Sequence, residues 1–202
     1  MPEPVAAIQD VWVWPNLTRL PNGDIVAMIY NQPSHGRMPG DVECWASTDE
    51  GETWTKRSVA APRRAPEQNR MNVAAGLTAT GNLILVNSGW SDPGNPDAWA
   101  KIGKVLPTWG CISKDNATIV LSYGKRGGEQ RGVEVVFSDN GGKTLRKPYR
   151  IVALDGTDLG YPSSVQRSDG QIVTAYCDGG SGTKGYYMGV VIWDPEQTRT
   201  ER

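Results

Sequence analysis

The stretch LTRLPNGDIVAMIY, residues 17–30, decides the fold, because it places a tight turn between two strand-like segments. Asn22 and Gly23 form a dipeptide that favours the positive φ angles of short hairpin turns. The flanking segments are rich in β-branched and other apolar residues, which favour strands. The stretch therefore predicts an antiparallel hairpin.

The same pattern recurs three more times along the chain. The further copies are GLTATGNLILVNSG (76–89), GCISKDNATIVLSYG (110–124) and SVQRSDGQIVTAYC (164–177). We expect third strands at 42–49, 132–139 and 185–193, and fourth strands at 53–60 and 145–153. A four-stranded antiparallel meander is the unit of a propeller blade, so the sequence predicts an all-β propeller.

The spacing of the turns indicates about three and a half blades. Gly23, Gly81, Asn116 and Gly170 lie 58, 35 and 54 residues apart, and the middle step is too short for a full blade. We expect one domain over 1–202, with a blade at 17–60, a partial blade at 73–105, a blade at 106–153 and a blade at 160–194. The alternating segment 7–14 is predicted to complete the last blade as its outer strand, which hides an edge.

Three and a half blades leave strand edges open, and open edges favour association. The sequence therefore favours a homodimer in which two chains close one ring. The alternative is a monomer in which the segment 91–109 completes a fourth blade.

Composition agrees with strands and turns, and it excludes several classes of function. The 202 residues include 24 Gly, 14 Pro, eight Trp and seven Tyr, which suit turns and pleated surfaces. A net charge of −1 provides no general attraction for nucleic acid or an anionic membrane. One His and three Cys without ligand spacing exclude a zinc motif, and no cofactor is expected. The first ten residues, MPEPVAAIQD, lack the parts of a signal peptide, which leaves localisation open between the cytoplasm and export with a signal since removed.

Residues 47–54 read Ser-Thr-Asp-Glu-Gly-Glu-Thr-Trp, and residues 138–145 repeat this pattern with Asn and Leu as variants. The pattern S-x-D-x-G-x-T-W resembles the Asp-box, or BNR repeat, of sialidases and related propellers. The Asp or Asn is expected to accept backbone N–H bonds across its turn, the Gly to permit the bend, and the Trp to pack beneath it. The residues given this structural role are Ser47, Asp49, Gly51, Trp54, Ser138, Asn140 and Gly142.

The resemblance to bacterial sialidase-like proteins also extends through 35–54, 69–76 and 158–177. It implies a six-bladed propeller whose central blades are absent from this chain. It also implies a site at the central funnel, on the face opposite the Asp-boxes. The longer loops lie on that face by our strand count and hold the only His, several Arg and unpaired acids, as functional loops on a rigid scaffold do.

The resemblance implies roles for individual loop residues. Tyr161, in the segment GYPSS, matches the nucleophile of sialidases, which use a Tyr instead of a carboxylate. Asp41 matches their acid/base residue. The substrate-binding candidates are His35, Arg37, Arg70, Asn72, Arg126 and Asp158.

Two departures from the sialidase pattern leave it open whether the chain is an active sialidase. Val13 stands where sialidases carry the substrate-binding Arg of an F-R-I-P motif, and their activating Glu comes from the central blades. A phenol with a pKa of about 10 and no nearby base is a poor nucleophile. The first hypothesis is a sialidase-like glycoside hydrolase that acts on or binds acidic sugars. The alternative is a non-catalytic carbohydrate-binding or self-assembling propeller module.

Overall fold

The computed structural model describes residues 2–12, 14–34, 38–77, 81–88, 110–112, 119–125, 130–140, 143–155, 160–179 and 185–200. The described residues form, in chain order, β1 (Val5–Gln9), β2 (Asn16–Arg19), β3 (Ile25–Tyr30), β4 (Val42–Ser47), β5 (Thr55–Ala61), β6 (Met71–Leu77), β7 (Leu83–Ser88), β8 (Gly110–Ile112), β9 (Ile119–Lys125), β10 (Gly132–Ser138), β11 (Tyr149–Ala153), β12 (Gly160–Gln166), β13 (Ile172–Asp178), β14 (Tyr187–Trp193) and α1 (Pro195–Thr200). No helix in these ranges is long and apolar enough to cross a membrane.

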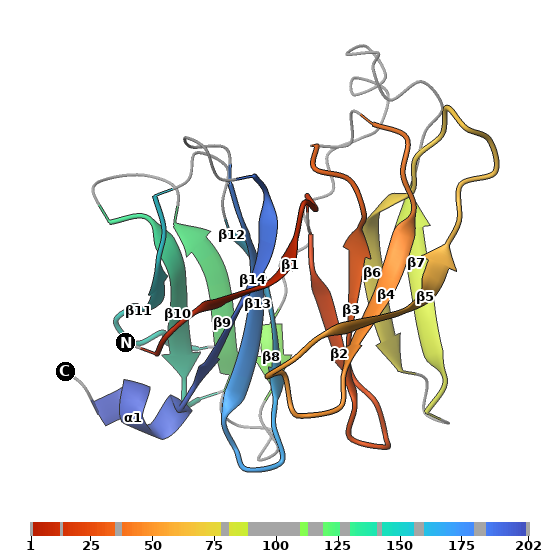
Figure 1. The fold of residues 1–202 in the computed structure, drawn as a ribbon. Coiled ribbons are helices and arrows are strands. Elements are labelled where there is room, and N and C mark those ends of the chain that lie inside the picture. Colours follow the sequence, from red (N-terminus) through yellow and green to blue (C-terminus); the bar gives the residue numbers. More distant parts are fainter. Residues whose placement is uncertain are drawn as a thin grey trace.

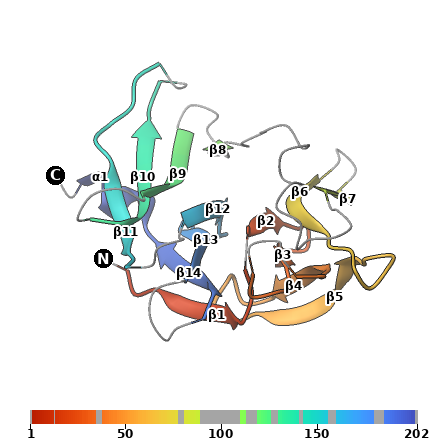
Figure 2. The ribbon, with the colours of Figure 1, turned by 90° about the horizontal axis from the view of Figure 1, so that it is seen from above.

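The strands form three four-stranded antiparallel sheets and one two-stranded sheet (Figure 1). The sheets have the strand orders β11-β10-β9-β8, β1-β14-β13-β12, β2-β3-β4-β5 and β6-β7. Viewed from above, they follow one another along an arc in that order (Figure 2). The expected all-β architecture of four-stranded antiparallel sheets is confirmed. The number of blades in a closed ring and the dimer stay predictions.

The N-terminal strand β1 pairs with β14, so residues from both ends of the chain share one sheet. Val5 lies opposite Val190, and Gln9 lies opposite Tyr187. The strand is shorter than the expected segment 7–14, because Asp10 adopts a φ of 57° and turns the chain. The backbone N–H of Trp12 then donates to the Gln32 carbonyl, 2.5 Å away, outside this sheet.

Other boundaries also differ from the sequence prediction. The strand before the second turn begins at Met71 and not at residue 76. β12 begins at Gly160, so Tyr161 lies inside the strand and not before it. The short helix α1 was not expected, although Asp194 and Pro195 are a typical helix start. Asp194 Oδ1 accepts the Glu196 N–H at 2.8 Å.

Side-chain hydrogen bonds join each sheet to the next. The hydroxyls of Ser122 on β9 and Ser164 on β12 lie 3.1 Å apart. Ser163 on β12 accepts the Leu17 N–H at 2.9 Å, and Asn16 on β2 accepts the Ala75 N–H of β6 at 3.0 Å. Ser163 and Asn16 are both buried. The last two bonds satisfy backbone donors, the N–H groups of Leu17 and Ala75.

The core fills the three spaces between neighbouring sheets. One buried cluster includes Ile25 and Ile29 of β3 with Val173 of β13 and Met188 of β14. A second joins β10 and β11 to β13 and β14. A third joins β3 and β4 to β6. Because the central strands have neighbours on both faces, they are mostly apolar and do not alternate; β3, β10 and β13 are buried at every position.

The turn at 47–54 closes on itself through side-chain hydrogen bonds. Asp49 Oδ1 accepts the Thr53 N–H at 2.9 Å, and the Ser47 hydroxyl donates to the same oxygen at 2.7 Å. Gly51 has a φ of 102°, and Trp54 Nε1 donates to the Gly51 carbonyl at 3.0 Å. In the turn that begins at Ser138, Asn140 Oδ1 accepts the Thr144 N–H at 3.0 Å. The amide therefore makes the same backbone bond as the carboxylate.

The 47–54 turn also ties its sheet to the neighbouring one. Glu50 forms an ion pair with Arg19 at 2.8 Å and accepts the backbone N–H and the hydroxyl of Ser168, each at 3.0 Å. Ser168 belongs to the turn between β12 and β13. A Cβ on Gly51 would lie 2.9 Å from a methyl group of Val173, so this position has no room for a side chain. The turn therefore joins two neighbouring sheets. It lies at the lower end of the sheets in Figure 1, where the hairpin turns also lie.

Replacing Asp49 tests the turn. We expect Asp49→Ala to lower the free energy of unfolding by about 1 kcal/mol at neutral pH and Asp49→Asn by less, because Asn140 makes the same backbone bond. Hydrogen bonds from the Thr53 hydroxyl and N–H and from Ser47 lower the pKa of Asp49 from 3.8 to about 2. A lowered pKa adds stability above pH 4 that is lost as the pH falls towards 2, so this acid dependence is expected to be weaker in both variants. Denaturant unfolding at neutral and acidic pH measures both effects; equal stability of Asp49→Ala and wild type would contradict this account.

Candidate functional site

Asp41 immediately precedes β4, whose start lies at the upper end of the sheets in Figure 1. Its backbone N–H donates to Asn31 Oδ1 at 2.9 Å, and its carbonyl accepts the Asn31 N–H at 3.1 Å. One carboxylate oxygen accepts the Arg63 N–H at 2.7 Å. Asp41 is half-buried. The carboxylate is therefore held between the two loops that follow β3 and β5.

Glu43, on β4, fixes this loop through a hydrogen bond from Asn31. Its role was not identified from the sequence. Glu43 is buried and accepts Asn31 Nδ2 at 3.0 Å, Trp45 Nε1 at 2.9 Å and Lys56 Nζ at 2.6 Å. Burial alone would raise the pKa of Glu43, but the hydrogen bonds from Lys56, Asn31 and Trp45 outweigh it and lower the pKa below its usual 4.5. Glu43 is therefore ionised at neutral pH and fixes the amide that orients Asp41.

Gly40 joins the two loops by close contact. Its N–H donates to the Gln68 carbonyl at 3.2 Å, and its carbonyl accepts the Arg70 N–H at 3.0 Å. A Cβ on Gly40 would lie 2.6 Å from the ring of Tyr30, whose hydroxyl donates to the Met38 carbonyl. Burial raises the pKa of Tyr30, so its hydroxyl remains a donor. Arg70 and Asp41 are far apart in the sequence, but the hydrogen bonds of Gly40 hold their backbones side by side.

Aromatic rings gather beside these loops. We use "aromatic cluster" for Trp12, Trp14, Tyr30, Tyr161 and Tyr186. The Trp14 ring lies 6.1 Å from Tyr30 and 6.2 Å, edge to face, from Tyr161. Trp12 lies 3.8 Å from Tyr186 and 6.4 Å from Trp14. Trp12 and Tyr30 are buried, whereas Trp14, Tyr161 and Tyr186 are half-buried residues.

Tyr161 joins this cluster in an unusual backbone conformation. Its φ is 53°, which is uncommon for a bulky residue, and it follows Gly160 with a φ of 106°. A Cβ on Gly160 would lie 2.8 Å from the backbone of Gly124, so β9 and β12 approach closely here. Strained backbone at a loop edge is typical of functional sites.

Arg70 immediately precedes Met71, which is fully buried against Trp12 and Tyr30. The Arg70 side chain is half-buried, and it makes no hydrogen bond or ion pair with the described residues. A guanidinium in this state has all its donors available to a ligand.

Three of the residues that the sequence singled out, Asp41, Arg70 and Tyr161, are linked by a chain of contacts through Gly40, Tyr30 and Trp14. Their role as site residues stays a prediction. Asn72 lies in β6, and the structure describes its backbone but not its side chain. His35, Arg37, Arg126, Asp158, Val13, Gly142 and the segment 91–109 lie outside the described residues.

Trp14 and Tyr30 were missed as site residues. Trp14 stood in the sequence next to Val13, in the segment compared with the sialidase F-R-I-P motif, and the pattern gave no sign that its ring meets Tyr161. No group of three or more His, Cys, Asp or Glu residues that would hold a metal ion occurs in the described ranges.

Comparisons with known proteins give weak likenesses. No protein-family model matches this chain, and no curated protein matches it. Among solved structures, it is similar to a protein of unknown function from Dyadobacter fermentans, with 17% identity over 87% of this chain and 51% of the other, and a TM-score of 0.38. An endo-1,4-β-xylanase from Bacteroides thetaiotaomicron has 12% identity over 93% and 91%, with a TM-score of 0.45. A Hadza microbial sialidase has 15% identity over 93% and 36%, with a TM-score of 0.38. The chain thus spans about half the length of the first of these and about a third of the sialidase.

Proposed function

We propose that this chain is a segment of a β-propeller that binds an acidic sugar at the upper, loop end of its sheets. The observation that carries the proposal is Arg70, a half-buried residue whose side chain has no described partner and whose neighbour Met71 packs against Trp12 and Tyr30 of the aromatic cluster. A planar guanidinium matches a carboxylate with two parallel hydrogen bonds. Arg70 is therefore the group that selects an acidic over a neutral sugar.

The surrounding residues supply the other contacts that a sugar requires. Trp14 and Tyr161, both half-buried residues, supply aromatic rings for the C–H side of a pyranose, and sites of this kind combine aromatic walls with a few polar groups. Asp41, held by Arg63 and Asn31, offers a carboxylate oxygen to a sugar hydroxyl. Sialic acid fits this set, since it carries one carboxylate and several hydroxyls.

The architecture belongs to the same proposal. The chain forms one propeller domain with the blade boundaries given above, and two chains complete one ring. Within the described residues the sheet β6–β7 has two strands, and an unpaired strand edge favours association. A homodimer would also bring the loops of both chains to one funnel.

Hydrolysis of the bound sialoside is the second candidate function. It is favoured by the connection of Tyr161, the nucleophile candidate, to the Asp41 loop through Trp14 and Tyr30. Turnover of a fluorogenic sialoside that is lost in Tyr161→Phe would support the enzyme. Absence of turnover with retained sugar binding would support the non-catalytic module.

Sugar binding itself is tested by calorimetry with 3′-sialyllactose and with lactose, which lacks the carboxylate. We expect Arg70→Gln to weaken sialyllactose binding by about tenfold or more, because a hydrogen-bonded charge pair is lost, and to leave lactose binding little changed. Arg64→Gln is the matched control, since Arg64 is an exposed residue of the same loop. Equal affinity of wild type and Arg70→Gln for sialyllactose would overturn the proposal.

A further inference from the structure

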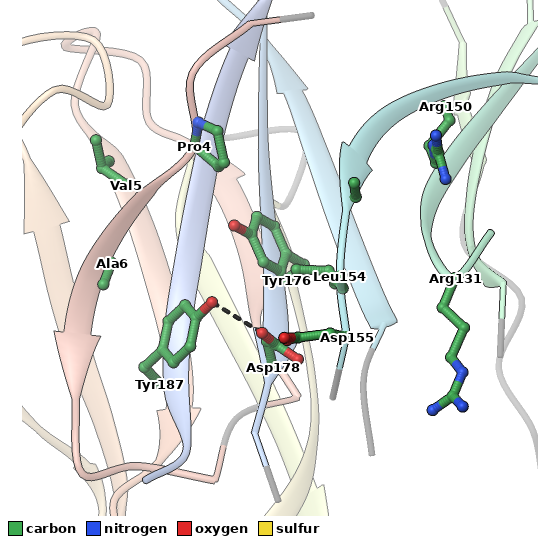
Figure 3. Close-up of a pocket in the computed structure, with 11 residues that line it drawn as sticks. Pro4, Val5, Ala6, Arg131, Arg150, Leu154, Asp155, Tyr176, Asp178 and Tyr187 are labelled. Carbon is green, nitrogen blue, oxygen red and sulfur yellow. Dashed lines mark hydrogen bonds between the residues drawn. The ribbon is translucent and has the colours of Figure 1, made fainter. Parts of the chain in front are cut away.

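The pocket between the sheet β8–β11 and the sheet that contains β1 does not gather its described polar groups around one point (Figure 3). It has a volume of about 450 Å³. The side chains of Arg131 and Arg150 are directed to separate places in Figure 3, and Arg150 lies opposite Glu134 in the pairing of β10 with β11. Asp178 accepts the Tyr187 hydroxyl at 2.9 Å. A different kind of reactive group lies in the turn between β2 and β3.

This turn carries the pair Asn22-Gly23, and the chain has one further Asn-Gly pair, Asn140-Gly141. Because glycine has no Cβ, its backbone nitrogen is less shielded than that of any other residue. The side-chain amide carbon of a preceding asparagine can therefore approach this nitrogen. That approach is the geometry of deamidation through a cyclic imide.

The Asn22 side chain is exposed and loosely held. Its Oδ1 accepts the Asp24 N–H at 3.2 Å, and its Nδ2 donates to none of the residues that the structure describes. A Cβ on Gly23 would meet only the Arg19 guanidinium, 4.0 Å away, so the turn has room for the Asn22 side chain to rotate. The Gly23 N–H donates to the Leu20 carbonyl at 3.0 Å, and this bond must open before reaction.

The Asn140 side chain is also exposed, but its described partners hold it at both ends of the amide. Its Oδ1 accepts the Ser138 hydroxyl and the Thr144 N–H, each at 3.0 Å. Its Nδ2 donates to the Thr144 hydroxyl at 2.9 Å. Rotation of Asn140 towards the next residue breaks these three bonds, whereas rotation of Asn22 breaks one, so the barrier is higher at Asn140.

We propose that Asn22 is a site of spontaneous deamidation in the folded protein and that the fold protects Asn140. The Gly23 nitrogen loses its proton and bonds to Asn22 Cγ, the bond from Cγ to Nδ2 breaks, and the amide nitrogen takes up the proton and leaves as ammonia. Water then opens the cyclic imide at either carbonyl and leaves aspartate or isoaspartate at position 22. No group is oxidised or reduced. The inference does not depend on the proposed sugar site.

Deamidation changes the turn in two ways. It places a carboxylate close to Asp24, whose ion pair with Arg57 has a length of 2.5 Å. Isoaspartate also lengthens the main chain between Leu20 and Asp24, where the Leu20 N–H donates to the Asp24 carbonyl at 2.8 Å. Since this bond closes the hairpin of β2 and β3, the isoaspartyl form should melt at a lower temperature than the unmodified protein.

The test follows both asparagines in one sample of the full chain, incubated in mildly alkaline buffer and then digested with trypsin. The fragments 20–37 and 132–143 each contain one Asn-Gly pair, and mass spectrometry measures deamidation in each. We expect Asn22 to react at least about tenfold faster than Asn140 in the folded protein, and at a comparable rate in concentrated urea. Equal rates in the folded protein would overturn the proposal, as would the same tenfold difference in urea.

Two variants separate the role of the fold from that of the sequence. Thr144→Val removes the hydroxyl that holds Asn140 Nδ2, so Asn140 should react several times faster while the rate at Asn22 is unchanged. Thr53→Val is the matched control, because Thr53 has the same position in the 47–54 turn, where Asp49 replaces the asparagine; it should leave both rates unchanged. An unchanged rate at Asn140 in Thr144→Val would contradict the protection that we assign to this turn.

Discussion

Trp193→Ala is expected to lower the free energy of unfolding by about 3–5 kcal/mol, the largest loss from a single substitution in this chain. Trp193 is 2% exposed and lies between the sheet that contains β14 and the sheet that contains β10. Its ring meets Phe137 edge to face at 6.1 Å, and its Nε1 donates to the Thr174 hydroxyl at 2.9 Å. The substitution leaves a cavity and removes one of two hydrogen-bond partners of the buried Thr174 hydroxyl, the other being the Ser164 hydroxyl at 2.9 Å.

Denaturant unfolding measures this loss, with Leu145→Ala as the control. Leu145 is 60% exposed, so its truncation should change stability by less than about 0.5 kcal/mol. Trp193→Phe keeps an aromatic ring, so its loss in free energy of unfolding should lie between those of Trp193→Ala and Leu145→Ala. This variant keeps the loss measurable if Trp193→Ala does not fold. A loss below about 1 kcal/mol for Trp193→Ala would show that the two sheets do not pack through this residue.

Glu43→Gln should produce the second largest effect, a loss of about 1.5–3 kcal/mol at neutral pH, because hydrogen bonds to a buried charge are weakened. The lowered pKa of Glu43 means that its contribution is present above the unfolded value of 4.5 and is lost as the pH falls through the folded value. The stability of wild type should therefore decrease in acid more steeply than that of the variant.

The same substitution should weaken sialyllactose binding, because Gln has one acceptor oxygen in place of two and cannot accept from Asn31, Trp45 and Lys56 as Glu43 does, so the amide that orients Asp41 is held less firmly. Glu52→Gln is the control, since the Glu52 side chain is 60% exposed and its ion pair with Arg167, at 3.4 Å, contributes little. Unchanged stability of Glu43→Gln at neutral pH would contradict the role given to Glu43.

The hairpins were predictable because their signals are local. Gly23, Gly81 and Gly170 have φ angles of 95°, 81° and 94°, as their turns require. The end of β1 was not predictable, because the alternation of 7–14 continues beyond Gln9 while the Trp12 N–H bonds to a distant loop. Local pattern thus indicated the strands, and tertiary contacts decided where they end.

The candidate site was predictable only in part. Asp41, Arg70 and Tyr161 were singled out from sequence, but their connection depends on rings from separate segments, which no spacing in the chain reveals. Glu43 did leave a signal in the sequence. Glu43 and Trp45 are two positions apart and so share one face of β4, and Lys56 lies opposite Trp45 on β5. A charged residue between apolar positions of a buried strand should therefore prompt a search for its partners.

The proposal that an acidic sugar binds at the aromatic cluster is tested most directly by the indole N–H resonances of the eight Trp residues. On titration with 3′-sialyllactose, the Trp14 resonance should shift, while those of Trp54, in the 47–54 turn, and Trp193, in the core, should stay in place. Lactose should shift Trp14 less at the same concentration. Binding of sialyllactose without a shift of Trp14, or with the main shift at Trp54, would contradict the account.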